Sequence, residues 1–260
     1  MQEVLRFNEA IDQSLQESAM RFSDQSNCAR DTFLAILGHD LRSPVATISM
    51  AGALLVRPTI DQANTNLIGA KVARSAATMT PMVDDLLEYA RSQLGGAIPI
   101  RPLLGDIAEI CRASVDEASA GHPDCTFQLE VTGETIGDYD APRLTQVFSN
   151  LLNNAAQYKG DQHPVTISTF GDSNVTVVQV KNYGPQIPRA ALTAIFAPLV
   201  QLSVATDQKG TASTSMGLGL FIAREITTSH GGTIDVESSE EAGIVFAVRL
   251  PKTMYPSQRQ

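Results

Sequence analysis

His39 and its neighbour Asp40 are the two side chains of this chain best suited to carry out a reaction. Apolar residues recur around them at three- and four-residue steps, which predicts an amphipathic helix with the stripe Leu34, Leu37, Leu41, Val45 and Ile48. At about 100° per residue, His39 falls roughly 150° from that stripe, so we expect its imidazole to face solvent. A solvent-exposed imidazole is partly neutral near neutral pH and keeps a lone pair that can attack a phosphorus atom. The adjacent carboxylate of Asp40 would orient the ring or accept its proton.

The residues after the histidine add to this interpretation. Ser43 lies one helical turn further on the same face, where its hydroxyl would hold a water molecule near a phosphorylated ring. Pro44 has no amide hydrogen, so it removes a backbone hydrogen bond to Asp40 and loosens the turn that carries His39. Taken alone, the pattern fits a solvated helix histidine beside an aspartate as well as it fits a phosphate acceptor. The other motifs of the chain must therefore decide.

Composition narrows the classes of function. The chain has 260 residues, enough for two modest domains, and a formal net charge of −9. This acidic balance, with no basic stripe, argues against a nucleic-acid-binding surface. No apolar run reaches the ~18 residues that span a bilayer, and we expect a cytoplasmic chain without a membrane segment. The three cysteines predict neither a disulfide framework nor a metal-binding pair, because they are odd in number and far apart: Cys28, Cys111 and Cys125.

The first part of the chain predicts a helical hairpin. Residues 1–30 have sparse, heptad-like apolar positions and fit either a short coiled coil or a frayed helical leader. A strong helix is expected over residues 31–55, and a second one over residues 63–94 that ends at two glycines. The apolar side of the second helix is formed by Leu67, Val72, Met79, Met82, Val83, Leu86 and Leu87. Because one hairpin cannot bury these stripes alone, residues 31–96 should pair with a second copy into a dimeric four-helix bundle.

The remainder of the chain alternates between strands and helices after a linker at residues 97–103. This pattern predicts an α/β sandwich over residues 104–255, with helices on one face of the sheet. The fold class is therefore multi-domain, an α hairpin followed by an α/β domain. Strands are expected at 126–131, 165–169, 175–182, 233–238 and 244–250, and helices at 103–120, 142–158 and 219–229.

Polar residues of the α/β part point to a nucleotide site. Asp140 should cap the helix at 142–158, and Asn150 and Asn154 lie four residues apart on one face of that helix. Amide oxygens can bind Mg²⁺ when phosphates supply the negative charge. Gly217 and Gly219 precede the last helix, where free backbone amides and the positive helix end favour a phosphate group.

The order and spacing of these motifs resemble the transmitter region of two-component sensor histidine kinases, over about residues 31–252. The resemblance implies a phosphotransfer hairpin followed by an ATP-binding sandwich of the histidine-kinase, gyrase and chaperone ATPase type. It implies that His39 is phosphorylated, with Asp40 as the neighbouring acid, and that Asn154 is the Mg²⁺ ligand. The nucleotide contacts that it implies are Asn150, Asn154, Tyr158, Lys159, Asn182, Gly184, Ile187, Phe196, Gly217, Leu218, Gly219 and Leu220.

The chain departs from the family pattern within the nucleotide site. Asn182 stands where an Asp usually recognises the amino group of adenine, and the loss of charge assistance costs on the order of 1 kcal/mol. Gln186 and Ser215 stand where glycines are usual, and Gln157 replaces a Lys or Arg for which Lys159 could substitute. At the phosphate acceptor, Ser43 stands where a Thr or Asn is usual, which bears on phosphatase activity. The expected nucleotide site is therefore weakened but still recognisable.

The leading hypothesis is a protein histidine kinase that uses ATP and Mg²⁺, works as a homodimer and autophosphorylates His39. It would pass the phosphoryl group to an Asp of a response-regulator receiver domain. The departures leave open an alternative, a histidine phosphotransfer protein with a degenerate second domain that does not use ATP. An ATP hydrolase of the gyrase and chaperone type is disfavoured, because the amide of Asn150 stands where those enzymes place a water-activating Glu. A dimeric scaffold without chemistry is the remaining interpretation.

Overall fold

The computed structural model describes residues 38, 41–56, 61–93, 95–160, 163–200 and 217–253. The chain divides into two compact units, Met1–Thr80 and Pro81–Gln260. The predictions for His39, Asp40, Ser215 and the leader at 1–30 therefore lie outside the described residues.

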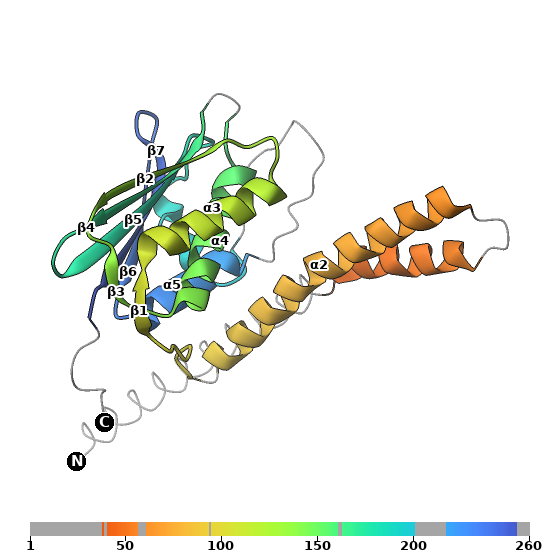
Figure 1. Ribbon diagram of the computed structural model, residues 1–260, viewed down its shortest axis with the longest axis horizontal. Helices are drawn as coiled ribbons and strands as arrows, with labels where there is room; N and C mark the ends of the chain where they lie inside the picture. Colours follow the sequence, from red (N-terminus) through yellow and green to blue (C-terminus); the bar gives the residue numbers. More distant parts are fainter. Residues whose placement is uncertain are drawn as a thin grey trace, which may run out of the picture. The chain divides into compact units, whose positions relative to one another are not determined.

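The first unit contains the predicted helical hairpin. Residues 41–55 form one helix, and the first part of α2 (Gln62–Gln93) runs antiparallel beside it (Figure 1). Ala51 and Ile68 are buried in this hairpin, whereas Val45 and Leu67 are 45% and 53% exposed. Their exposure in the single chain agrees with the expectation that one hairpin cannot bury its own apolar stripes, because one neighbouring helix covers only one side of each helix.

The second unit contains the predicted α/β sandwich. Its main sheet has the strand order β2-β4-β5-β7-β6, and only β2 and β4 are parallel among the paired strands that the structure describes. Three helices lie on one face of this sheet (Figure 1). The strands are β2 (Phe127–Gly133), β4 (Val165–Gly171), β5 (Val175–Asn182), β6 (Thr233–Ser239) and β7 (Gly243–Pro251), and the helices are α3 (Ile107–Gly121), α4 (Ala141–Gln157) and α5 (Gly219–Ser229). Two short 3₁₀ helices, η1 (Arg189–Ala191) and η2 (Ala194–Phe196), follow β5.

One segment differs from the predicted secondary structure. The helix expected from residue 103 begins at Ile107, because the side chain of Asp106 accepts a hydrogen bond from the backbone N–H of Ala108 at 2.9 Å and so caps α3. The four residues before it form β1 (Leu103–Asp106), which pairs antiparallel with β3 (Ile136–Tyr139) in a separate two-stranded sheet. The linker is therefore followed by a strand.

The hydrophobic core lies between the main sheet and its three helices. Side chains alternate between the two faces of β5, and every second one points into the core. The buried row is Thr176, Val178, Val180 and Asn182, and it packs against the apolar face of α4 formed by Leu144, Val147, Phe148, Leu151 and Leu152. Asn182 thus occupies the last core-facing position of the strand.

Candidate functional site

The start of α4 is fixed by Asp140, as the sequence predicts. One oxygen of its carboxylate accepts a hydrogen bond from the backbone N–H of Arg143 at 3.2 Å, and the other accepts from the N–H of Arg101 at 2.6 Å. His230, which is also buried, accepts a hydrogen bond at Nε2 from the backbone N–H of Asp140 at 3.2 Å. Its Nδ1–H donates to the carbonyl of Ile226 at 2.8 Å, and burial lowers its pKa. His230 is therefore a neutral, structural residue that ties the end of α5 to the start of α4.

The middle of α4 holds the start of α5. The side-chain amide of Asn150 donates a hydrogen bond to the carbonyl of Gly219 at 3.0 Å. A Cβ at Gly219 would lie 3.4 Å from Cγ of Asn150, which is ordinary van der Waals contact, so the side chain of Asn150 lies directly against this residue. Gly217 has a positive φ of 67° and accepts a hydrogen bond at its carbonyl from Leu199 at 3.0 Å. The glycines predicted to approach a phosphate thus lie at the start of α5, next to α4.

The turn after β5 lies against the end of α4. Gly160 donates its backbone N–H to the carbonyl of Tyr183, and a Cβ at Gly184 would overlap the carbonyl oxygen of Tyr158. Asn182 precedes this turn, is 1% exposed, and its amide nitrogen is buried without a hydrogen-bond partner in the described part of the chain. A buried amide donor that none of the described groups satisfies is unusual and fits a site that a ligand completes.

Other predicted contacts serve mainly as anchors. The rings of Phe196 and Phe246 are edge to face, with centroids 6.2 Å apart, and Leu218 is fully buried before α5. The backbone N–H of Ile187 donates to the hydroxyl of Ser238 at 3.0 Å. Leu220 is half-buried in the first turn of α5. These side chains hold the segments that surround the site.

The predicted residues do not all come together. The structure gathers Asn150, Asn154 and Tyr158 along α4, with Gly219 beside Asn150 and Gly184 beside Tyr158. The positive charge of Lys159 lowers the pKa of the Cys125 thiol, against the larger effect of burial, which raises it, and the predicted contact of Lys159 with a nucleotide stays a prediction. Ser43 is an exposed residue of the first unit.

A buried ionic contact that the sequence analysis missed joins α4 to the base of α2, by which we mean residues 81–93. The carboxylate of Glu88 accepts hydrogen bonds from the guanidinium of Arg143 and from the side-chain amide of Gln146, the latter at 3.0 Å. Glu88 is 7% exposed, and next to it the ring of Tyr89 meets the ring of Phe221 of α5, with centroids 5.8 Å apart. No spacing signal reveals this contact, because its partners are more than 50 positions apart.

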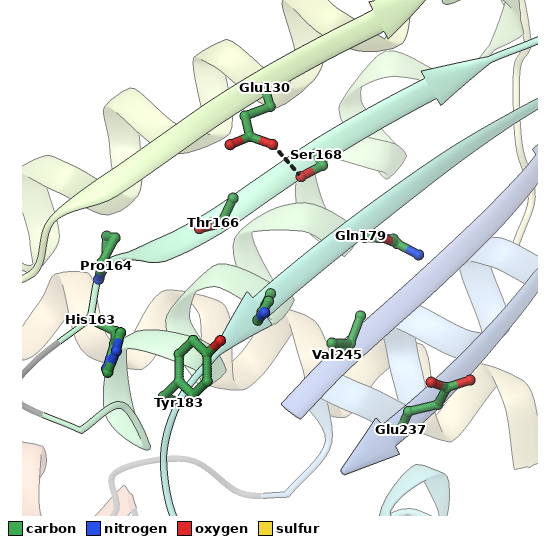
Figure 2. Close-up of a pocket in the computed structure, with 10 residues that line it drawn as sticks. Glu130, His163, Pro164, Thr166, Ser168, Gln179, Tyr183, Glu237 and Val245 are labelled. Carbon is green, nitrogen blue, oxygen red and sulfur yellow. Dashed lines mark hydrogen bonds between the residues drawn. The ribbon is translucent and has the colours of Figure 1, made fainter. Parts of the chain in front are cut away.

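The opposite face of the main sheet has a polar concavity of about 530 Å³ (Figure 2). The rings of His163 and Tyr183 lie 4.3 Å apart at one end of it, and the ammonium of Lys181 lies 4.7 Å from the centre of the Tyr183 ring. Lys181 and Tyr183 flank Asn182 in the sequence, so their side chains point away from the core-facing side where the α4 residues lie. This concavity is separate from the candidate site.

Two family models match the chain. Residues 29–95 match the His Kinase A (phospho-acceptor) domain, and residues 139–254 match the histidine kinase-, DNA gyrase B- and HSP90-like ATPase. The first covers the predicted phosphate acceptor and the hairpin, and the second covers the α4, β5 and α5 residues described above.

Curated relatives align along nearly the whole chain. The probable sensor histidine kinase TcrY of Mycobacterium tuberculosis is 32% identical over 96% of this chain and 52% of its own length. The bacteriophytochrome of Pseudomonas aeruginosa is 28% identical over 95% of this chain and 33% of its own length, and the sensor protein VanSC of Enterococcus gallinarum is 26% identical over 94% and 66%. The chain therefore spans between a third and two thirds of the length of these relatives.

Solved structures agree with the fold. The catalytic domain of the histidine kinase ThkA aligns with a TM-score of 0.50 and 28% identity, over 60% of this chain and all of that domain. The histidine kinase AdeS of Acinetobacter baumannii aligns with a TM-score of 0.58 over 82% of this chain and 98% of its own, and at 18% identity it supports the fold alone. None of the described helices has the length and apolar character needed to cross a membrane.

Proposed function

We propose that this chain is an ATP-dependent protein kinase whose phosphate acceptor is His39, because it belongs to the family of two-component sensor histidine kinases and matches their transmitter region. The observation that carries the proposal is the presence of a phospho-acceptor domain and an ATPase domain on one chain, in that order. A phosphotransfer protein that does not use ATP is less favoured, because TcrY is named as a probable sensor histidine kinase and the site beside α4 keeps Gly184, Gly217 and Gly219.

The reaction needs positioning more than covalent help from the protein. A ring nitrogen of His39 would form a bond to the terminal phosphorus of ATP while the bond to the bridging oxygen breaks, and ADP would leave. Asp40 would accept the proton that the imidazole loses. The phosphorylated ring would then donate its phosphoryl group to an Asp carboxylate of a receiver domain. Because ATP is supplied in the cytoplasm, we place this activity there.

The residues of α4 fit a nucleotide with a single Mg²⁺ ion. The described residues contain no group of three or more His, Cys, Asp or Glu side chains that could hold a metal ion by themselves. Mg²⁺ is usually held by one or two protein oxygens together with phosphate oxygens, and the half-buried amide of Asn154 lies one turn from both Asn150 and Tyr158. When bound, the ion would neutralise phosphate charge. Asn150 would keep the start of α5 in place, so that the free amides of its first turn face the phosphates.

A homodimer is part of this proposal. Apolar side chains of the hairpin remain exposed in the single chain, and a second copy would cover them in a four-helix bundle. Among the described residues of the first unit, the exposed large apolar side chains are Val45, Met50, Leu55, Val56 and Leu67.

Incubation of the full chain with Mg²⁺ and terminally labelled ATP tests the proposal. We expect acid-labile label on the protein, its loss in His39→Gln and its retention in His163→Gln, which changes an exposed histidine on the far side of the sheet. Label that survives in His39→Gln would show that another residue is the acceptor. Label taken up only from a phosphorylated receiver domain would instead support the phosphotransfer alternative.

A further inference from the structure

Asn182 has a hydrogen-bond donor that no described residue of the protein satisfies. Its side chain is 1% exposed, and the amide nitrogen has no hydrogen-bond partner among the residues that the structure describes. Buried polar groups nearly always have a partner, so an orphan donor indicates that a ligand supplies the missing acceptor.

The position of Asn182 places this donor on the nucleotide side of the sheet. It is the last core-facing residue of β5, and the turn that follows it, at Gly184, lies against Tyr158 at the end of α4. Asn154, on the same helix, is the residue to which we assign Mg²⁺. The family resemblance assigns this position to the base of the nucleotide, so the ligand that we place at Asn182 is the base, and the inference rests on the proposed function.

An amide and a carboxylate select bases differently. A carboxylate only accepts hydrogen bonds, so it pairs with the 6-amino group of adenine and repels the 6-oxo group of guanine. An amide offers a donor beside an acceptor, and rotation of its plane by about 180° exchanges the two. In one orientation it matches the amino group and N1 of adenine, and in the other it matches O6 and N1–H of guanine.

We propose that Asn182 relaxes the base selectivity of this site, so that it binds both 6-aminopurine and 6-oxopurine nucleotides. The same residue that weakens adenine recognition then removes the repulsion that would exclude guanine. Selectivity between ATP and GTP would be controlled by this one side chain, because the donor and acceptor at its end are the groups that read position 6 of the purine.

Calorimetric titration of the full chain with ADP and with GDP, in Mg²⁺, tests the inference. We expect the two dissociation constants to agree within about tenfold. In Asn182→Asp, GDP binding should weaken at least tenfold more than ADP binding. Asn153→Asp makes the same chemical change on an exposed residue of α4, whose side-chain oxygen Oδ1 lies 3.1 Å from Nε2 of His122, and it should leave the ratio unchanged.

The outcomes separate this inference from the proposed function. Binding of ADP with GDP more than about tenfold weaker in the unchanged chain overturns the inference and leaves the kinase proposal standing. Binding of neither nucleotide by a chain with a native circular dichroism spectrum overturns both. If Asn182→Asp fails to fold, the ratio measured on the unchanged chain decides.

Discussion

Asp85 should make the stability of the second unit depend on pH. It lies in the base of α2, where burial, followed by the negative charges of Glu88 and Asp84, raises its pKa from 3.8 to about 7. Arg143 is engaged by Glu88 and does not relieve this effect. The folded chain therefore keeps a proton on Asp85 in a pH range where the unfolded chain has released it.

The sign and size of the effect follow from this difference. Because the folded pKa is the higher one, the stability linked to Asp85 is complete below pH 3.8 and is lost as the pH rises to about 7. Each pKa unit corresponds to about 1.4 kcal/mol, so the full loss is on the order of 4 kcal/mol. The Asp85→Asn substitution removes the ionisable group and keeps the shape. It should raise the free energy of unfolding by up to about 4 kcal/mol at pH 8, but by less than about 2 kcal/mol at pH 5.

Urea unfolding at several pH values between 5 and 8 measures this difference. Circular dichroism is the suitable signal, because the chain contains no Trp. Asp84→Asn is the matched control, since it removes a neighbouring exposed carboxylate and should change the pH profile much less. A stability difference between the unchanged chain and Asp85→Asn that stays constant across this range would refute the argument.

Two further predictions concern contacts of α4. Arg143→Ala should lower the free energy of unfolding by roughly 2 to 4 kcal/mol, because it leaves the buried carboxylate of Glu88 unpaired. The double variant Glu88→Ala plus Arg143→Ala should lose less stability than the sum of the two single variants. Urea unfolding of all three variants checks this, and additive losses would contradict it. Gly184→Ala should destabilise the second unit by roughly 1 to 3 kcal/mol and weaken nucleotide binding, because the added Cβ would overlap the backbone at the end of α4. Gly69→Ala, in an open helical position, should be neutral or stabilising. Equal stability of the two glycine variants in urea unfolding would contradict the close approach at Gly184.

Much of the α/β fold could be predicted because its main elements are strongly patterned. The strand at 175–182 is rich in β-branched residues and lies between turn-forming neighbours, and the structure has it at both predicted ends. The small sheet of β1 and β3 escaped because each strand has four residues and contains a glycine, Gly105 or Gly137, so neither shows a period. Leu103 and Leu104, which read as helix, are exposed in β1.

The site shows the same division between local and distant information. Spacing along one helix predicted that Asn150 and Asn154 share a face, and the capping role of Asp140 was readable from the residues that follow it. The partners of these residues were not readable. Gly219 lies 69 positions from Asn150, and Glu88 lies 55 positions from Arg143, so only the folded chain brings them together.

These contacts make α4 the element that aligns the parts of the candidate site. Its polar residues Gln146, Asn150, Asn154 and Tyr158 follow one another at four-residue steps, so they form a single, slowly winding stripe. Along it, the helix contacts the base of α2, then the start of α5, and finally the turn after β5. The opposite side of α4 is fixed in the core, so the helix cannot rotate to satisfy one of these contacts at the expense of another. A substitution on the core side of α4 should therefore disturb all three contacts together, whereas one within the stripe should disturb its own partner first.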